Sequence, residues 1–354
     1  MSGPPGQTRN RTVKKLLLAT TAIVSIGGAA SAAEIKLTGY AEIGIFDGDA
    51  AGIDTQFHND WQVDFRLSGE TDGGLTFGGR IQLEENNESS NINGTPRIDE
   101  ESLFVSGDFG RITLGETDGA YNWGLGFIYS GTSLRDDHSS HAGAYWFTGL
   151  DGSYDDQIAR YEYSFGDFGV AVSAELDDDE TTAQGSSPVA NGDTVFGVGG
   201  KWASNINGMD IAVGVGYQDN GDFEIWGVSG SIALPMGISI AAGYADLDGF
   251  VSHYASSNGF DATADSWYGV SVAYQTGALL VSANYGAYDT ESINGTATSS
   301  DLEGFGVVAN YDLGGGAVVM AGYGYSDVPS SLGNIGSFNG NGEETWSLGL
   351  GLSF

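Results

Sequence analysis

The sequence predicts an all-β fold, a 16-stranded antiparallel transmembrane β-barrel, and three observations point to it. Apolar and polar residues alternate in many segments of about ten residues, the length of a tilted membrane-spanning strand. Short glycine-containing turns alternate with longer polar connections. After the first 33 residues, no segment approaches the roughly 20 consecutive apolar residues that a spanning helix needs. A closed barrel is then the remaining way to cross a membrane, because it leaves no unpaired sheet edge in lipid.

Residues 1–33 are predicted to be a cleaved signal peptide. A basic start containing Arg9, Arg11, Lys14 and Lys15 precedes an apolar run over 16–26, and Ala30-Ser31-Ala32 is a small-residue cleavage sequence. The mature barrel is expected to span residues 34–354. The absence of cysteine excludes disulfides and thiolate chemistry.

The first strand shows the alternation clearly. Ile35, Leu37, Ala41 and Ile43 lie on one face, and polar residues such as Glu42 lie on the other. Sixteen strands are predicted near residues 34–46, 57–69, 75–86, 98–107, 110–116, 158–165, 168–177, 195–204, 209–218, 223–234, 237–246, 265–275, 278–288, 302–312, 317–326 and 343–354.

The connections form a second pattern. Tight turns such as 71–74, 107–110, 166–169 and 234–237 alternate with long polar stretches such as 87–97, 178–194, 247–264 and 327–342. This alternation predicts short periplasmic turns, long extracellular loops and both termini on the periplasmic side. The alternative fold is a soluble β-sandwich, as in a secreted acidic adhesin. Tyrosine and tryptophan at many strand ends, which would form an interfacial girdle, favour the barrel.

The charge balance restricts the partners. The chain has 47 acidic and 12 basic residues, and four of the basic ones lie in the first fifteen positions. Such a protein repels nucleic acid, so no nucleic-acid partner is expected, and it attracts cations to any concave region.

Three segments resemble Gram-negative general diffusion porins of the alphaproteobacterial type. They are the mature start 34–40, the turn and strand 107–116, and the last strand 346–354. The resemblance implies an outer-membrane channel for passive diffusion through a water-filled lumen, a homotrimer, contact with lipid and lipopolysaccharide, and no enzymatic activity. It also implies insertion by the barrel-assembly machinery, which reads the terminal strand. The predicted assembly signal is Trp346, Leu348, Leu350, Leu352 and Phe354.

Residues 117–157 form a loop of unusual length, and the resemblance implies that it folds into the lumen and narrows it. Four arginines fall on the polar face of nearby strands, so they are predicted to form the basic wall of the constriction: Arg66, Arg80, Arg111 and Arg160. The loop is predicted to supply the opposing acidic side: Asp118, Asp136, Asp137, Asp151, Asp155 and Asp156. A fixed transverse field would then select among ions. The alternative is that each arginine only pairs with a neighbouring carboxylate.

The remaining features carry weaker predictions. His138 and His141 are expected to be solvated rather than metal ligands. No cofactor is expected, although Ca²⁺ bound weakly at acidic loop segments such as 177–180 stays open. The aromatic residues of the long loop leave a sugar-specific channel open as a second function.

Overall fold

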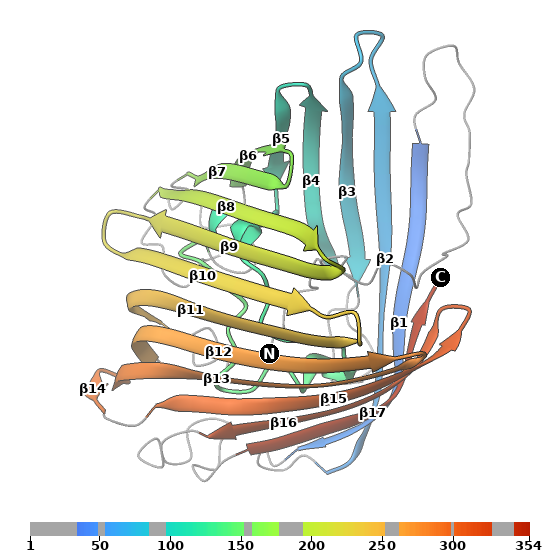
Figure 1. Ribbon diagram of the computed structural model, residues 1–354, viewed down its shortest axis with the longest axis vertical. Helices are drawn as coiled ribbons and strands as arrows, with labels where there is room; N and C mark the ends of the chain where they lie inside the picture. The colour runs from blue at the N-terminus through green and yellow to red at the C-terminus, as the bar shows by residue number, and fades with distance from the viewer. Residues whose placement is uncertain are drawn as a thin grey trace.

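Sixteen long antiparallel strands close into one barrel, because the first strand pairs with the last (Figure 1). The computed structural model describes residues 34–48, 54–84, 97–151, 158–176, 194–251, 262–298, 301–327 and 343–354. The predicted signal peptide, Asp155 and Asp156 lie outside these residues, as do residues 177–180. The barrel strands are β1 Glu34–Gly48, β2 Gln56–Glu70, β3 Thr76–Glu84, β4 Arg97–Gly107, β5 Gly110–Gly115, β6 Ile158–Phe165, β7 Phe168–Glu175, β8 Val195–Ile206, β9 Met209–Asp219, β10 Glu224–Ala233, β11 Ile238–Val251, β12 Ala262–Thr276, β13 Leu279–Ile293, β15 Leu302–Gly314, β16 Ala317–Asp327 and β17 Glu343–Ser353.

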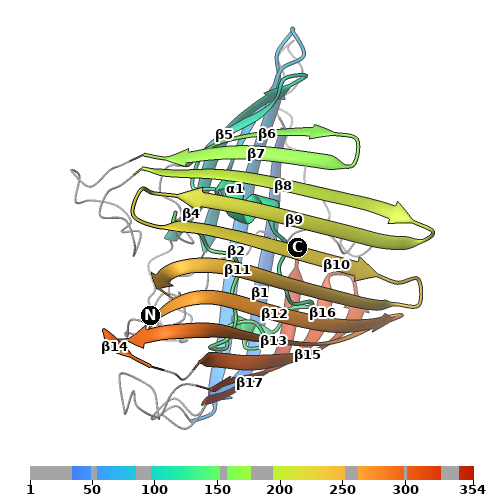
Figure 2. The ribbon, with the colours of Figure 1, turned by 60° about the vertical axis from the view of Figure 1, so that its left-hand side comes forward.

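The closing seam confirms the barrel against the β-sandwich. Ile43 of β1 faces Leu350 of β17, and the carboxy-terminal Phe354 exchanges two backbone hydrogen bonds with Gly39, at 2.9 and 3.2 Å. The short turns lie together at one end of the barrel (Figure 2). Each strand therefore pairs with its neighbour in sequence, and only the seam joins residues far apart in the chain.

Side chains alternate between the outer surface and the lumen as the strand period requires. In β9, Val213, Val215 and Tyr217 are exposed, whereas Gly214 and Gly216 between them are buried. The exposed apolar side chains of such alternating positions form the lipid-facing surface.

The long connection predicted at 247–264 is shorter than expected. Strand β11 continues to Val251 and β12 begins at Ala262, with a register shift between Asp246 and Phe250. Asp248 and Gly249 adopt positive φ there, so the turn-like residues form a bulge inside a strand. Strand β13 likewise continues to Ile293, and the two-residue β14, Thr296–Ala297, folds back on its end.

Helical structure in the described part of the chain is confined to the long loop. The helix α1 covers Ala120–Gly124 and the 3-10 helix η1 covers Leu134–Asp136. Neither is long and apolar enough to cross a membrane.

Candidate pore constriction

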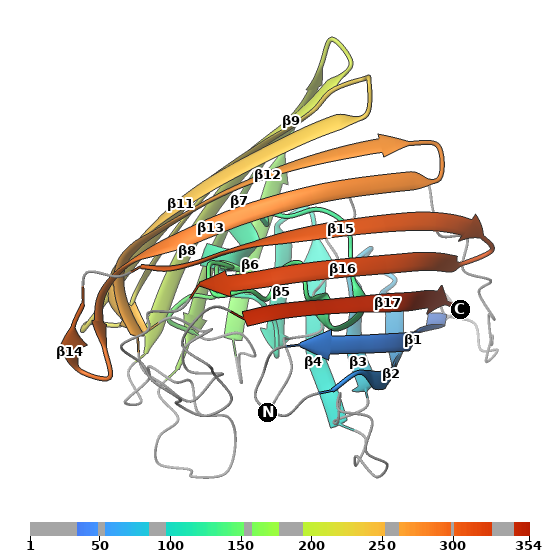
Figure 3. The ribbon, with the colours of Figure 1, turned by 90° about the horizontal axis from the view of Figure 1, so that it is seen from below.

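The long loop between β5 and β6 crosses the inside of the barrel. Its helix α1 packs against β7, β8 and β9, and η1 packs against β1, β16 and β17 (Figure 3). The loop thus lies on the inner face of β7–β17 and of β1, and leaves the inner face of β2–β6 facing the lumen. An opening between the loop and β2–β6 follows from this path.

Glycines in the wall let the loop backbone approach closely. A Cβ atom at Gly199 would lie 1.9 Å from the carbonyl oxygen of Ala120, and one at Gly306 would lie 1.8 Å from that of His138. Any larger residue at either position would push the loop into the lumen. The many glycines of the second half of the chain are in part explained by this seat.

Hydrogen bonds from wall side chains hold the loop along its length. Their donors and acceptors are small polar residues on lumen-facing strand positions. Ser173 and Ser229 accept from the loop amides of Ala120 and Gly126, both at 2.8 Å. Ser347 donates to the carbonyl oxygen of Leu134 at 2.9 Å. Asn284 donates to the carbonyl oxygen of His138 at 2.7 Å. Because they satisfy buried backbone groups of an irregular loop, these contacts fix its path.

Aromatic side chains form the centre of the interface between loop and wall. Tyr145 and Phe147 of the loop both pack on Trp267 of β12, with ring centroids 5.4 Å apart in each pair. The indole nitrogen of Trp267 donates to the carbonyl oxygen of Gly143 at 2.9 Å. Trp267 is 2% exposed, so the whole ring is buried against the loop.

The expectation that His138 and His141 are solvated is wrong. Both are buried, and His141 lies 2.7 Å from the side-chain oxygen of Asn284. Burial lowers the pKa of His138 to about 3 and that of His141 to about 4, so both rings are neutral at pH 7. They are packing residues of the docked loop. The described residues contain no group of three or more His, Cys, Asp or Glu side chains that could hold a metal ion.

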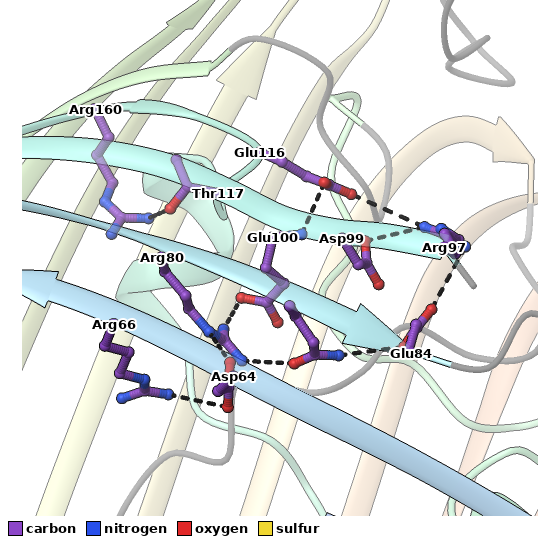
Figure 4. Close-up of polar contacts among 11 residues, drawn as sticks. Asp64, Arg66, Arg80, Glu84, Arg97, Asp99, Glu100, Glu116, Thr117 and Arg160 are labelled. Carbon is purple, nitrogen blue, oxygen red and sulfur yellow. Dashed lines mark hydrogen bonds and ion pairs between the residues drawn. The ribbon is translucent and has the colours of Figure 1, made fainter. Parts of the chain in front are cut away.

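The four predicted arginines lie on the open wall, two on each side of β4. Arg80 is held by Asp64 at 2.6 Å and also pairs with Glu100 (Figure 4). Arg66 lies 3.6 Å from the other oxygen of Asp64, and its side chain is 48% exposed. Arg66 is therefore the more accessible charge of this pair.

Arg111 and Arg160 share Glu162 of β6, at 4.0 and 3.1 Å. Arg160 also donates to Thr117 at 3.3 Å and to the carbonyl oxygen of Asp118, and so ties the start of the loop to the wall. Every arginine of the predicted basic wall thus has a carboxylate partner on that same wall, which is the alternative left open by the sequence.

Sequence reasoning missed Arg97 and its carboxylates. Arg97 lies 3.0 Å from Asp99 and 3.9 Å from both Glu84 and Glu116 (Figure 4). The alternation of β4 places Leu103 outside, and counting back in twos would place Arg97 outside as well. Glu100, at φ 57°, forms a bulge that reverses the faces, so Arg97 lies inside.

The acidic residues predicted for the loop side are not all at the open rim. Asp137 and Asp151 are 6% and 4% exposed, and Asp151 accepts a hydrogen bond from Gln218 of β9. Burial raises the pKa of Asp137 to about 6 and that of Asp151 to about 7. These two carboxylates are placed in loop packing because the loop buries one of its faces against the barrel. Asp118 and Asp136 are half-buried, and their role at the aperture stays a prediction.

Comparisons with known proteins agree with this architecture. A family model described as Gram-negative porin matches residues 19–330. A porin from Rhodobacter capsulatus is 28% identical over 312 residues, which cover 84% of this chain and 96% of that protein. A refined porin structure covers 91% of this chain and 100% of its own, with a TM-score of 0.62 at 23% identity. A triple mutant of the Rhodopseudomonas blastica porin covers 90% and 100%, with a TM-score of 0.63 at 16% identity.

The family match extends over most of the chain, and the structural matches reproduce the closed 16-stranded barrel. Since the loop inside the barrel leaves an open wall of charged side chains, the geometry is that of a channel. The chain belongs to the Gram-negative porin family, and it is an outer-membrane porin that forms a channel.

Proposed function

We propose that the lumen is a passive path for ions and small hydrophilic solutes and that it prefers cations. The carrying observation is the pairing of the basic wall: each of its arginines lies within ion-pair distance of a carboxylate from neighbouring strands. The arginines are therefore neutralised locally. The large acidic excess of the chain is left to attract cations to the lumen.

Replacing Arg66 by glutamine is expected to increase cation preference. Its side chain is nearly half exposed and its partner Asp64 remains bound to Arg80, so the barrel loses one accessible positive charge without losing a buried pair. The zero-current potential of the purified protein in a planar bilayer, under a KCl gradient, measures this preference. Arg66→Lys is the control that keeps the charge. A wild-type potential in Arg66→Gln would mean that Arg66 does not border the conducting path, and a wild-type protein selective for chloride would overturn the proposed preference.

The second candidate is a sugar-specific channel. Phe127 and Tyr129 of the loop stack at 5.4 Å and are only half-buried, which is the arrangement that binds sugar rings. Tyr121, Tyr145 and Phe147 are instead buried against the wall and do not add to such a surface. Flux of a sugar that saturates with concentration would favour this candidate, and flux that stays linear favours general diffusion. A catalytic role has no support in the sequence motifs, and we propose a channel without enzymatic activity.

The outer surface supports contact with lipid headgroups and lipopolysaccharide. On β9–β17, outward carboxylates lie just beyond outward aromatic residues at the end with the longer connections: Asp219 beyond Tyr217, Glu303 beyond Phe305, Asp327 beyond Tyr325 and Glu344 beyond Trp346. Aromatic rings at this level mark the membrane interface. All eight lysines and arginines after residue 33 lie on lumen-facing positions of β1–β8 or on the loop: Lys36, Arg66, Arg80, Arg97, Arg111, Arg135, Arg160 and Lys201. An acidic rim without basic residues would contact anionic lipid phosphates through weakly bound divalent cations such as Ca²⁺. Chelator-dependent loss of co-purifying lipopolysaccharide would test this contact.

Family likeness supports a homotrimer, which cross-linking of the detergent-purified protein would detect as a species of three chains. It also supports insertion by the barrel-assembly machinery through the terminal strand. Deleting Phe354 is expected to reduce the assembled protein severalfold, because the residue pairs with Gly39 at the closing seam and ends the proposed signal. The amount of heat-modifiable, folded barrel in outer membranes measures the effect. Phe354→Tyr keeps the aromatic end and serves as control. Undiminished assembly after the deletion would show that the terminal residue is not read.

A further inference from the structure

Arg97 lies among three carboxylates at the extracellular side of the open wall. Its guanidinium is 3.0 Å from Asp99 and 3.9 Å from Glu84 and from Glu116, which come from β4, β3 and the residue after β5 (Figure 4). These four residues are called the Arg97 cluster. Along β3, Glu84 opposes Arg97 and Arg80 opposes Ser102, so the cluster lies beyond the Arg80 pair toward the extracellular end.

The cluster contains more negative charge than its single guanidinium balances. Asp99 is fully buried, and its Oδ2 atom has no hydrogen-bond partner among the described residues. The side chains of Glu84 and Glu116 are 14% and 16% exposed. Burial, with Asp99 and Glu101 nearby, raises the pKa of Glu116 to about 9. Carboxylates this crowded need a bound proton or a bound cation, since unpaired buried charges are costly.

Arg97 supplies one such cation from the chain itself. Its side chain is 30% exposed, so one side of the cluster faces the lumen. Oxygen atoms from several carboxylates are the ligands that Ca²⁺ prefers. The described residues nevertheless contain no group of acidic side chains arranged to hold a metal ion, and here the guanidinium lies within 4 Å of all three carboxylates.

We propose that Arg97 is a specificity-determining residue of the channel, a tethered counter-ion that keeps divalent cations from binding among Glu84, Asp99 and Glu116. Monovalent cations then pass the extracellular side of the constriction without a strong trap. This role depends on conduction through the lumen, which the proposed function assumes. A channel needs ions to bind weakly enough to leave, and a free cage of three carboxylates would retain a divalent ion.

The test is block of the K⁺ current by added Ca²⁺. Purified wild-type protein, Arg97→Gln and Arg97→Lys are compared in planar bilayers at fixed KCl and pH 8, with Ca²⁺ titrated on each side. We expect Arg97→Gln to be blocked at a Ca²⁺ concentration at least about tenfold lower than wild type, because one positive charge is removed from the cage. Arg97→Lys keeps the charge and is expected to stay near wild type. In Arg97→Gln with Glu116→Gln the block is expected to weaken again.

Arg66→Gln is the matched control, because it removes an arginine of the same wall whose partner Asp64 is also bound by Arg80. Its monovalent selectivity should shift while its Ca²⁺ sensitivity should not. Calorimetric titration of Ca²⁺ into detergent-purified Arg97→Gln gives a second readout that needs no conduction. Unchanged Ca²⁺ block and no added heat in Arg97→Gln would overturn the role of Arg97. Loss of all K⁺ current in the wild type would instead count against the proposed function.

Discussion

Replacing Trp267 by alanine is expected to release the middle of the loop from the wall and to enlarge and destabilise the open-channel current. The ring is buried between Tyr145 and Phe147, and its nitrogen holds the carbonyl oxygen of Gly143. Removing a buried tryptophan costs about 3–5 kcal/mol, and here most of that cost falls on docking of the loop because the strand hydrogen bonds of β12 are backbone bonds. Single-channel conductance and open-channel noise in planar bilayers measure the effect.

Trp226→Ala is the matched control. Trp226 lies on β10, is 45% exposed on the outer surface and packs on Tyr244, so its loss changes the lipid-facing surface and not the loop. Both variants should keep the circular dichroism of a β-barrel. A folded Trp267→Ala protein with the conductance and noise of the wild type would show that the loop keeps its place without this contact, and the aromatic anchor would have to be rejected.

The strands could be predicted from the sequence because their signals are local. A period of two and a glycine-containing turn are readable within about ten residues, and each of the sixteen predicted strands is present. The prediction failed where a strand carries turn-like residues. Asp248 and Gly249 resemble a loop, and only pairing of Phe250 with Ala264 across the bulge extends β11 beyond them.

The constriction was less predictable because its contacts join distant parts of the chain. Gly306 and Gly199 are unremarkable strand glycines until the loop backbone lies on them. Parity correctly placed Arg66, Arg80, Arg111 and Arg160 on the lumen side, yet their carboxylate partners depend on register between strands. Arg97 was missed because one residue, Glu100, reverses the faces of β4. Burial of Asp151 depends on Gln218, which lies 67 residues along the chain.

The buried carboxyl of Asp151 gives the loop a pH dependence that one substitution should remove. Burial raises its pKa to about 7, against 3.8 for the free side chain. In the docked loop it is protonated below pH 7, whereas in an undocked loop it ionises above pH 3.8. Docking of the wild-type loop therefore weakens as pH rises from about 4 to 7 and changes no further through this group above pH 7. The total loss corresponds to about 4 kcal/mol, at 1.36 kcal/mol for each pH unit of the shift.

Asp151→Asn keeps the size and the acceptor for Gln218 but cannot ionise. We expect the variant to resist thermal unfolding better than wild type at pH 8, and the two proteins to converge near pH 4. Melting temperatures in detergent and the rate of proteolysis within the loop, measured across this range, give the comparison. The buried histidines contribute equally to both proteins, so the difference between them isolates Asp151. A constant difference from pH 4 to pH 8 would mean that Asp151 stays ionised in the docked loop, and that Gln218 and the nearby Arg160 stabilise its charge more than burial opposes it.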